Sequence, residues 1–285
     1  MTEFDATKIA KICHIGTEHF QAQLQSTEHR LAILSKWDIP KGSKVLELGC
    51  GQGDCTAVLA ELVGPNGYVT AVDPGSLDYG SPYTLGQAQD NISSSVLGPR
   101  ITWKHADPIE FLKNDDGEYD VAALVLCTWY FASPKVLSDM LSTLTKSKIG
   151  KVCIAEWGLS STQAQSHILA ALAQAAVQYH NPSSSSNIRT LFSPAVIEAS
   201  AIEAGLKLQS SSTLIPADNV LDGLWEVQMV LGTEFMKDLD SFVKDDRQKV
   251  LIKSMRDAVR ASYEQAGGRK QIRSMDVWCA TFVKA

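Results

Sequence analysis

The stretch Val45–Asp54, which reads VLELGCGQGD, decides the fold. A short apolar run leads directly into glycines at positions 49, 51 and 53, and a helical pattern follows. Glycine lets the backbone turn sharply, and it leaves no Cβ between the chain and a bound molecule. A strand, a glycine-rich turn and a helix in this order are typical of a nucleoside-binding α/β fold.

Acidic residues around the glycines indicate which nucleoside is bound. The dinucleotide fingerprint GxGxxG does not fit, because Asp54 stands where the last glycine belongs. Glu47, two residues before the first glycine, disfavours an anionic pyrophosphate and favours a cationic ligand. Asp73 lies 20 residues after Gly53, at the expected end of the next strand, where a carboxylate can accept both ribose hydroxyls. This pattern favours a sulfonium nucleoside over NAD.

The rest of the chain alternates short apolar runs with helical patterns, which predicts a largely parallel sheet covered by helices. The strands are expected at 44–48, 68–72, 101–105, 120–126, 152–156, 206–212 and 277–283. Asp54 is expected to cap the first helix of this core.

Three helical segments lie outside this alternation. They cover residues 17–37, an Ala-rich stretch at 162–179, and about two helices within 221–265, where Trp225 and Met229 are expected in the core. We therefore expect an N-terminal helical cap at 1–40 and a core at 41–285. That core carries helical insertions at about 159–190 and 216–272.

The motif E-L-G-C-G-Q-G resembles motif I of the class I S-adenosylmethionine-dependent methyltransferases. Asp73, Ala106-Asp107 and Tyr119–Val121 resemble the family motifs at the next three strands. The resemblance covers about residues 41–157 and the final strand. It implies a Rossmann-like seven-stranded sheet with its last strand antiparallel, here with helical lid insertions. The flanking helices and residues 79–89 resemble small-molecule methyltransferases of fungal secondary metabolism.

The resemblance also implies how S-adenosylmethionine is bound and S-adenosylhomocysteine released. Gly49, Cys50 and Gly51 would line the methionine half, with Glu47 bracing the loop or receiving a water-mediated contact. Asp73, followed by Pro74, would bind the ribose. The remaining positions that match the family pattern are Asp107 and Pro108 at the adenine, and Cys127 and Thr128 beneath the sulfonium. The chain departs from the family in its long connections after Asp73 and between the last two strands.

Methyl transfer from a sulfonium is an in-line displacement, so the site must chiefly align the reacting atoms and exclude water. An oxygen or nitrogen acceptor also has to lose a proton, for which a histidine is the usual base. We expect His19, His167 or His180 to deprotonate or orient the acceptor. The aromatic residues expected to form the acceptor wall are Trp129, Tyr130 and Trp157, which follow the fourth and fifth strands.

Charge, apolar runs and cysteine spacing indicate which partners and which cellular location are expected. Lys and Arg number 26 against 32 Asp and Glu, so the chain lacks the basic character of nucleic-acid-binding proteins. The longest apolar run has seven residues, at 121–127, whereas a membrane-spanning helix needs roughly 20. The N-terminal sequence does not resemble a secretory signal, and the six dispersed cysteines include no CxxC pair. We therefore expect a cytoplasmic protein with reduced thiols.

No metal site is expected, because the sequence holds no HxxxH, no cysteine pair and no Asp-rich loop. The predicted substrate is a small organic molecule, and a homodimer is possible because the late insertion suits either a lid or a subunit contact. Three alternatives stay open. In the first, the protein is a non-methylating enzyme of the same fold. In the second, it is a non-catalytic partner that binds the nucleoside, and in the third it methylates a protein substrate.

Overall fold

The computed structural model describes residues 4–16 and 18–285 and contains one seven-stranded sheet in the order β3-β2-β1-β4-β5-β7-β6. Thr17, the expected start of the first helical segment, lies outside the described residues. The strands are β1 (Lys44–Leu48), β2 (Tyr68–Asp73), β3 (Ile101–His105), β4 (Glu118–Val125), β5 (Lys148–Trp157), β6 (Leu206–Leu214) and β7 (Val277–Lys284).

The first five strands are parallel, and β7 runs antiparallel between β5 and β6. The central strand β4 is buried from Val121 to Val125, as its continuous apolar run requires. This order and the reversed last strand confirm the predicted seven-stranded Rossmann-like methyltransferase sheet.

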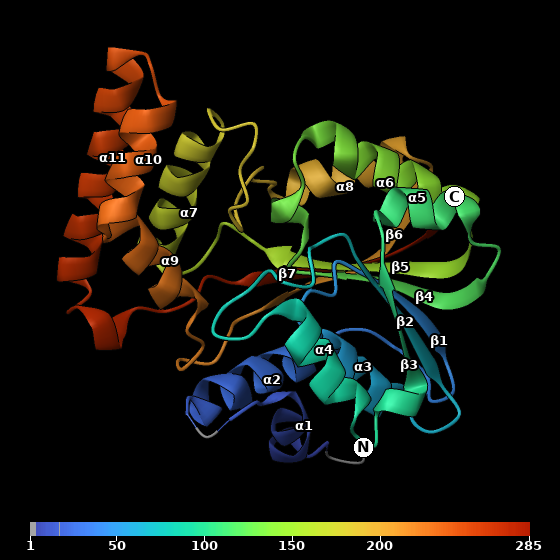
Figure 1. Cartoon of the computed structure of the whole chain (residues 1–285). Coiled ribbons are helices and arrows are strands. Elements are labelled where there is room, and N and C mark those ends of the chain that lie inside the picture. The colour runs from blue at the N-terminus through green and yellow to red at the C-terminus, as the bar shows by residue number, and fades with distance from the viewer. Residues whose placement is uncertain (1–3, 17) are drawn as a thin grey trace.

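Helices cover both faces of the sheet (Figure 1). One face carries α1 (Ala6–Cys13), α2 (Phe20–Leu34), α3 (Asp54–Val63) and α4 (Leu85–Ser93), and the other carries α5 (Pro108–Asn114), α6 (Pro134–Lys146) and α8 (Pro194–Glu203). A separate group of four helices stands beside the carboxyl end of β5 (Figure 1). These are α7 (Gln165–Gln178), α9 (Asp222–Leu231), α10 (Thr233–Phe242) and α11 (Asp246–Gln265), which we call the lid.

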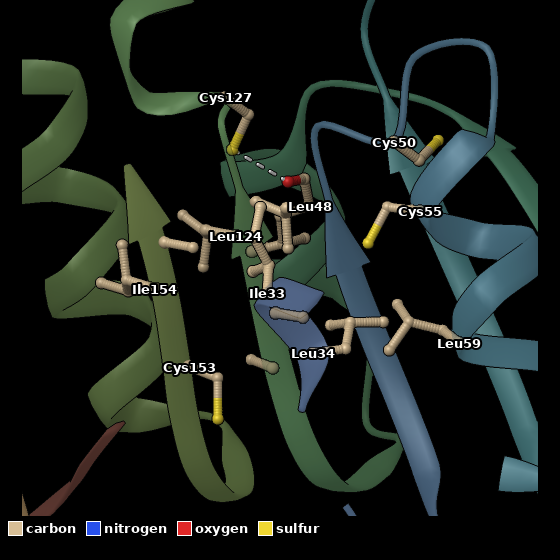
Figure 2. Packing of buried hydrophobic residues seen from close by; sticks show 14 of the residues in the cluster. Ile33, Leu34, Leu48, Cys50, Cys55, Leu59, Leu124, Cys127, Cys153 and Ile154 are labelled. Atoms are coloured by element: carbon tan, nitrogen blue, oxygen red, sulfur yellow. Dashed lines mark hydrogen bonds between the residues drawn. The ribbon is translucent and has the colours of Figure 1, made fainter. Parts of the chain in front are cut away.

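The main core lies between the sheet and its helices. Ile33 and Leu34 of α2 are fully buried in it beside Leu48 and Leu124, so the N-terminal cap is packed into the core (Figure 2). All six cysteines are buried free thiols, as expected for small core residues. The lid has a second cluster of its own, built from residues such as Val177 and Val227.

Several local expectations were wrong. The late insertion holds three helices instead of two, and Gly53, in the left-handed conformation, is the N-cap of α3, with Asp54 its first helical residue. Trp225 and Met229 are 48% and 45% exposed, because α9 buries the side that carries Val227 and Val230. Their helical spacing was real, but it marks the outer side of the helix.

Candidate active site

The glycine loop after β1 is held in place by backbone contacts. The N–H groups of Gly49 and Cys50 donate to the carbonyl of Val72, at 2.8 and 3.3 Å. Gly49 has φ 79°, and a Cβ built there would lie 2.7 Å from the Cβ of Cys127. The thiol of Cys127 in turn donates to the carbonyl of Leu48 at 3.2 Å (Figure 2). The structure therefore brings Gly49 and Cys127 together, and glycine is required where they meet.

Asp73 ends β2 beside this loop. One of its carboxylate oxygens accepts from the N–H of Gly51 and the other from the N–H of Gly75, both at 2.7 Å. The side-chain amide of Gln89 donates to the carbonyl of Gly51 at 2.8 Å, and Gln89 lines a small hollow together with Asp73, Gly75 and Leu77. Each carboxylate oxygen keeps a further lone pair, and a Cβ at Gly51 would meet nothing within 4 Å. The residues therefore fit a ribose diol approaching bare backbone.

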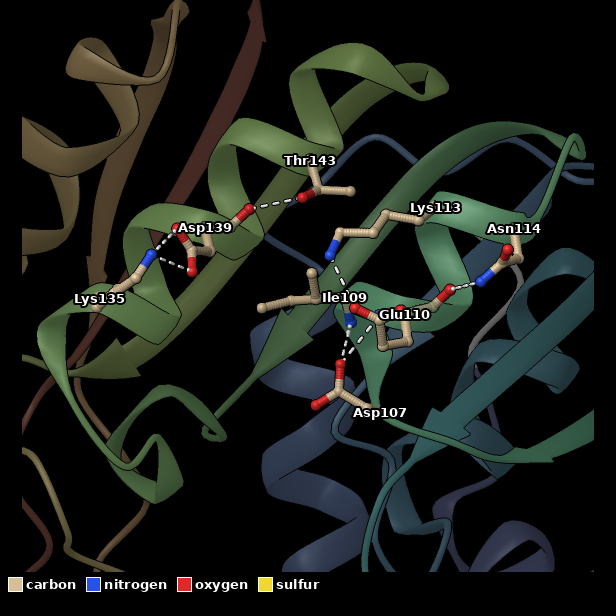
Figure 3. A network of polar contacts seen from close by, with 8 residues as sticks. All are labelled: Asp107, Ile109, Glu110, Lys113, Asn114, Lys135, Asp139 and Thr143. Carbon is tan, nitrogen blue, oxygen red and sulfur yellow. Dashed lines mark hydrogen bonds and ion pairs between the residues drawn. The ribbon is translucent and has the colours of Figure 1, made fainter.

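Asp107 follows β3 and caps α5 (Figure 3). One of its oxygens accepts from the N–H groups of Ile109 and Glu110, at 2.9 and 3.0 Å. Its other oxygen points away from these two N–H groups (Figure 3) and suits a contact with an adenine amino group. Pro108 is buried at the first helical position, and Pro74 is exposed directly after Asp73.

Two buried glutamates support the site from below. Glu47 accepts from the hydroxyl of Thr56 at 2.5 Å, and burial raises its pKa to about 7. Its side chain therefore contacts the first turn of α3. Glu156 on β5 accepts from the N–H and hydroxyl of Thr128, at 2.9 and 2.7 Å, and burial raises its pKa to about 7 as well. The sequence analysis missed Glu156, although an acidic residue ending a buried strand was an available signal.

The raised pKa of Glu47 predicts how stability depends on pH. The folded state binds its proton more tightly than the unfolded state, whose carboxyl titrates near 4.5. This contribution to stability is therefore present at low pH and is lost as pH rises through 7. Between pH 5.5 and 7.5 the wild type should lose about 2 kcal/mol from this group. Glu47→Gln should remove that slope in urea unfolding, while Glu18→Gln, at an exposed site, should keep it. Parallel pH curves for wild type and Glu47→Gln would contradict the assignment.

The three predicted acceptor-wall residues differ in their surroundings. Trp129 is buried in the main core, and its indole N–H donates to the carbonyl of Phe192 at 2.9 Å. Tyr130 is 47% exposed and available to a ligand. Trp157 is buried, stacked on His29 at 5.6 Å between ring centroids and set edge-on to His167 at 5.1 Å.

The three predicted histidines do not come together. His19 precedes α2 with its side chain 78% exposed, and His180 follows α7 with its ring edge-on to Tyr179. His167 is fully buried, and its Nδ1 accepts from the N–H of Met275 at 3.0 Å. Burial lowers its pKa to about 3, so the ring is neutral and carries its proton on Nε2. His167 contacts another predicted site residue, Trp157.

His29 is a further residue that the sequence analysis missed. It is buried on α2, burial lowers its pKa to about 3, and its Nε2 finds no hydrogen-bond partner in the part of the chain described. Its place four residues before the buried Ile33 was the available signal. Over residues 4–16 and 18–285, no group of three or more His, Cys, Asp or Glu side chains is arranged to hold a metal ion. Over the same residues, no helix is long and apolar enough to cross a membrane.

Comparisons with known proteins agree with this geometry. Residues 45–147 match a family described as a methyltransferase domain. Methyltransferase phomM' of Diaporthe leptostromiformis is 28% identical over 89% of this chain and 82% of its own length. The 2-phytyl-1,4-naphtoquinone methyltransferase of Nostoc punctiforme is 34% identical, over 34% of this chain and 40% of its own length.

Two solved structures share the fold of this chain. A cyclopropane-fatty-acyl-phospholipid synthase-like protein from Lactobacillus casei superposes with a TM-score of 0.85 and 28% identity, covering 98% of both chains. The [4+2]-cyclase SpnF, at a TM-score of 0.52 and 14% identity over 95% of this chain and 84% of its own, shares the fold alone. With its glycine loop, strand-end acids and reversed last strand, the chain has the fold of the class I S-adenosylmethionine-dependent methyltransferases, and its residues 45–147 match a methyltransferase domain.

Proposed function

We propose that the protein methylates an oxygen or nitrogen atom of a small organic molecule by in-line displacement. The observation that carries the proposal is a contact between two segments at the carboxyl edge of the sheet. The hydroxyl of Tyr79, in the loop after β2, donates to the carbonyl of Ser185, in the connection after α7, at 3.3 Å. A contact that joins the loop on the donor side to the lid side suits a small acceptor better than a protein surface.

The methyl donor supplies an electrophilic methyl group on a positively charged sulfur. In this proposal, the bare backbone at Gly49–Gly51 and the carboxylates of Asp73 and Asp107 hold the nucleoside. Glu156 fixes Thr128 at the end of β4. Tyr130 and Trp157 exclude water on the acceptor side. Alignment of this kind is worth roughly 7–11 kcal/mol of the barrier in favourable cases.

Among the histidines, we propose that His167 positions the acceptor wall through Trp157. Its neutral ring cannot take a proton readily, so its role is to orient. His167→Ala should lower turnover more than tenfold and destabilise the fold by about 1–3 kcal/mol, because the N–H of Met275 loses its acceptor. His19→Ala and His180→Ala should stay within about twofold of wild type. Steady-state assays of the three variants test this. Near-wild-type turnover in all three would leave alignment alone as the mechanism.

Calorimetric titration with S-adenosylhomocysteine and with NAD, followed by transfer of a labelled methyl group to a panel of small acceptors, tests the proposal as a whole. We expect binding of the first ligand only, and a label attached to oxygen or nitrogen. The similarity to a protein described as cyclopropane-fatty-acyl-phospholipid synthase-like favours one second candidate, a reaction at carbon instead of a heteroatom. Label recovered on carbon would favour that candidate. Tight binding of S-adenosylhomocysteine with no methylated product would favour a non-methylating enzyme of the same fold.

The partners remain proposals from the sequence. The net charge of −6 supports the absence of a nucleic-acid partner. A cytoplasmic location and a homodimer also remain proposals. Light scattering on the purified chain tests the homodimer.

A further inference from the structure

Glu226 on the lid helix α9 is a buried acid with an unused oxygen. The side chain is 8% exposed, and one of its carboxylate oxygens accepts from the side-chain amide of Asn187. The other oxygen is fully buried and has no hydrogen-bond partner within the described ranges. A buried carboxylate oxygen without a donor costs free energy, so this atom is arranged to receive a donor from outside the chain.

Asn187 ties Glu226 to the end of β4. The segment that starts at Asn187 runs along the turn Thr128–Tyr130, because the N–H groups of Arg189 and Thr190 donate to the carbonyl of Trp129 at 2.8 and 3.1 Å. The unused oxygen therefore belongs to the acceptor side of the site, next to the turn that follows Cys127.

The charges around Glu226 indicate what kind of donor is expected. Burial raises the pKa of Glu226 to about 7, and the charge of Asp222, one turn earlier on α9, raises it further. Arg256 of the lid donates to the carbonyls of Val230 and Leu231, so its guanidinium is already engaged. No ion pair to Glu226 occurs among residues 4–16 and 18–285. A positively charged ligand group would supply the partner that this carboxyl lacks.

We propose that Glu226 binds the amino group of the acceptor, so that the substrate is a small basic amine methylated on nitrogen. This inference rests on the proposed function and narrows it. The ammonium group of the acceptor gives a proton to the unused oxygen of Glu226, which leaves a neutral nitrogen with a free lone pair. The nitrogen forms a bond to the methyl carbon as the carbon–sulfur bond breaks, its electron pair remaining on sulfur. The product leaves as a methylated ammonium ion, and Glu226 returns its proton to water.

The test uses matched acceptors and conservative variants. Phenethylamine, tyramine and tryptamine are each paired with the alcohol of the same carbon skeleton, and the labelled methyl group is located by mass spectrometry. We expect the wild type to methylate the amines and not the paired alcohols. Glu226→Gln keeps the shape and the bond to Asn187. It should raise KM for the amines at least tenfold and leave the affinity for S-adenosylhomocysteine within twofold. Glu226→Asp should recover part of the loss.

Each other outcome counts against a specific claim. Unchanged kcat/KM for the amines in Glu226→Gln, or a wild type that methylates the hydroxyl oxygen of the alcohols and not the amines, overturns the role of Glu226. The second result leaves the proposed function standing. A wild type that binds S-adenosylhomocysteine but methylates neither set contradicts the proposed function itself. Glu234→Gln, on an exposed part of the lid, is the control and should behave as wild type.

Discussion

Replacing Asp73 by Ala should weaken the binding of S-adenosylhomocysteine more than tenfold. The substitution removes the two oxygens that suit the ribose hydroxyls. It also leaves the N–H groups of Gly51 and Gly75 without acceptors, so the glycine loop loses its tie to the end of β2. Isothermal titration calorimetry at constant pH measures this change directly.

Two controls separate ribose binding from loop support. Asp73→Asn keeps one acceptor oxygen and should fall between wild type and Asp73→Ala. Asp107→Ala removes a helix cap, which costs about 1 kcal/mol of stability, and it should weaken donor binding less than Asp73→Ala does. An unchanged affinity in Asp73→Ala would remove the ribose assignment.

Gly49→Ala should abolish donor binding and destabilise the fold by several kcal/mol. Two effects add at this position. A non-glycine residue at φ 79° costs about 1–2 kcal/mol, and the new Cβ would lie 2.7 Å from the Cβ of Cys127. Because Cys127 is buried between Gly49 and the core, neither side can move away without disturbing β1 or β4. Urea unfolding and titration with S-adenosylhomocysteine measure the two losses.

Gly42 provides a matched control for this experiment. Its φ of 86° carries a similar backbone cost, but a Cβ there would meet nothing within 4 Å. Gly42→Ala should therefore cost only about 1–2 kcal/mol and leave donor affinity unchanged. Equal losses in Gly42→Ala and Gly49→Ala would show that the contact with Cys127 is unimportant. Partial recovery in Gly49→Ala combined with Cys127→Gly would show that it is decisive.

The strand order and the donor-side residues were predictable because they are local. Gly49, Asp73 and Asp107 each lie at the end of a strand or within two residues after it, and parallel strands bring such positions to one edge of the sheet. The acceptor side was less predictable, because its residues meet only through tertiary packing. The ring of His29 on α2 stacks on Trp157 at the end of β5, and Glu226 on α9 is linked to the end of β4 by its hydrogen bond with Asn187. The spacing of these residues along the chain does not predict either contact.

The sequence also led to a wrong expectation about which side of α9 is buried. Trp225 and Met229 share one side of α9, and their apolar character favoured burial. The neighbouring side carries Val227 and Val230, which pack against α7 and α11 in the lid core. Where apolar residues occupy two sides of a short helix, periodicity alone cannot say which side is covered.

Three of the four lid helices, α9, α10 and α11, lie between two strands that are already neighbours. Leu214, the last residue of β6, pairs with Val277, the first residue of β7, so residues 215–276 leave and rejoin the sheet at points about 5 Å apart. A connection between two points this close requires almost no change in the geometry of the sheet. The segment 215–276 can therefore change in length and sequence without altering the strand order of the sheet.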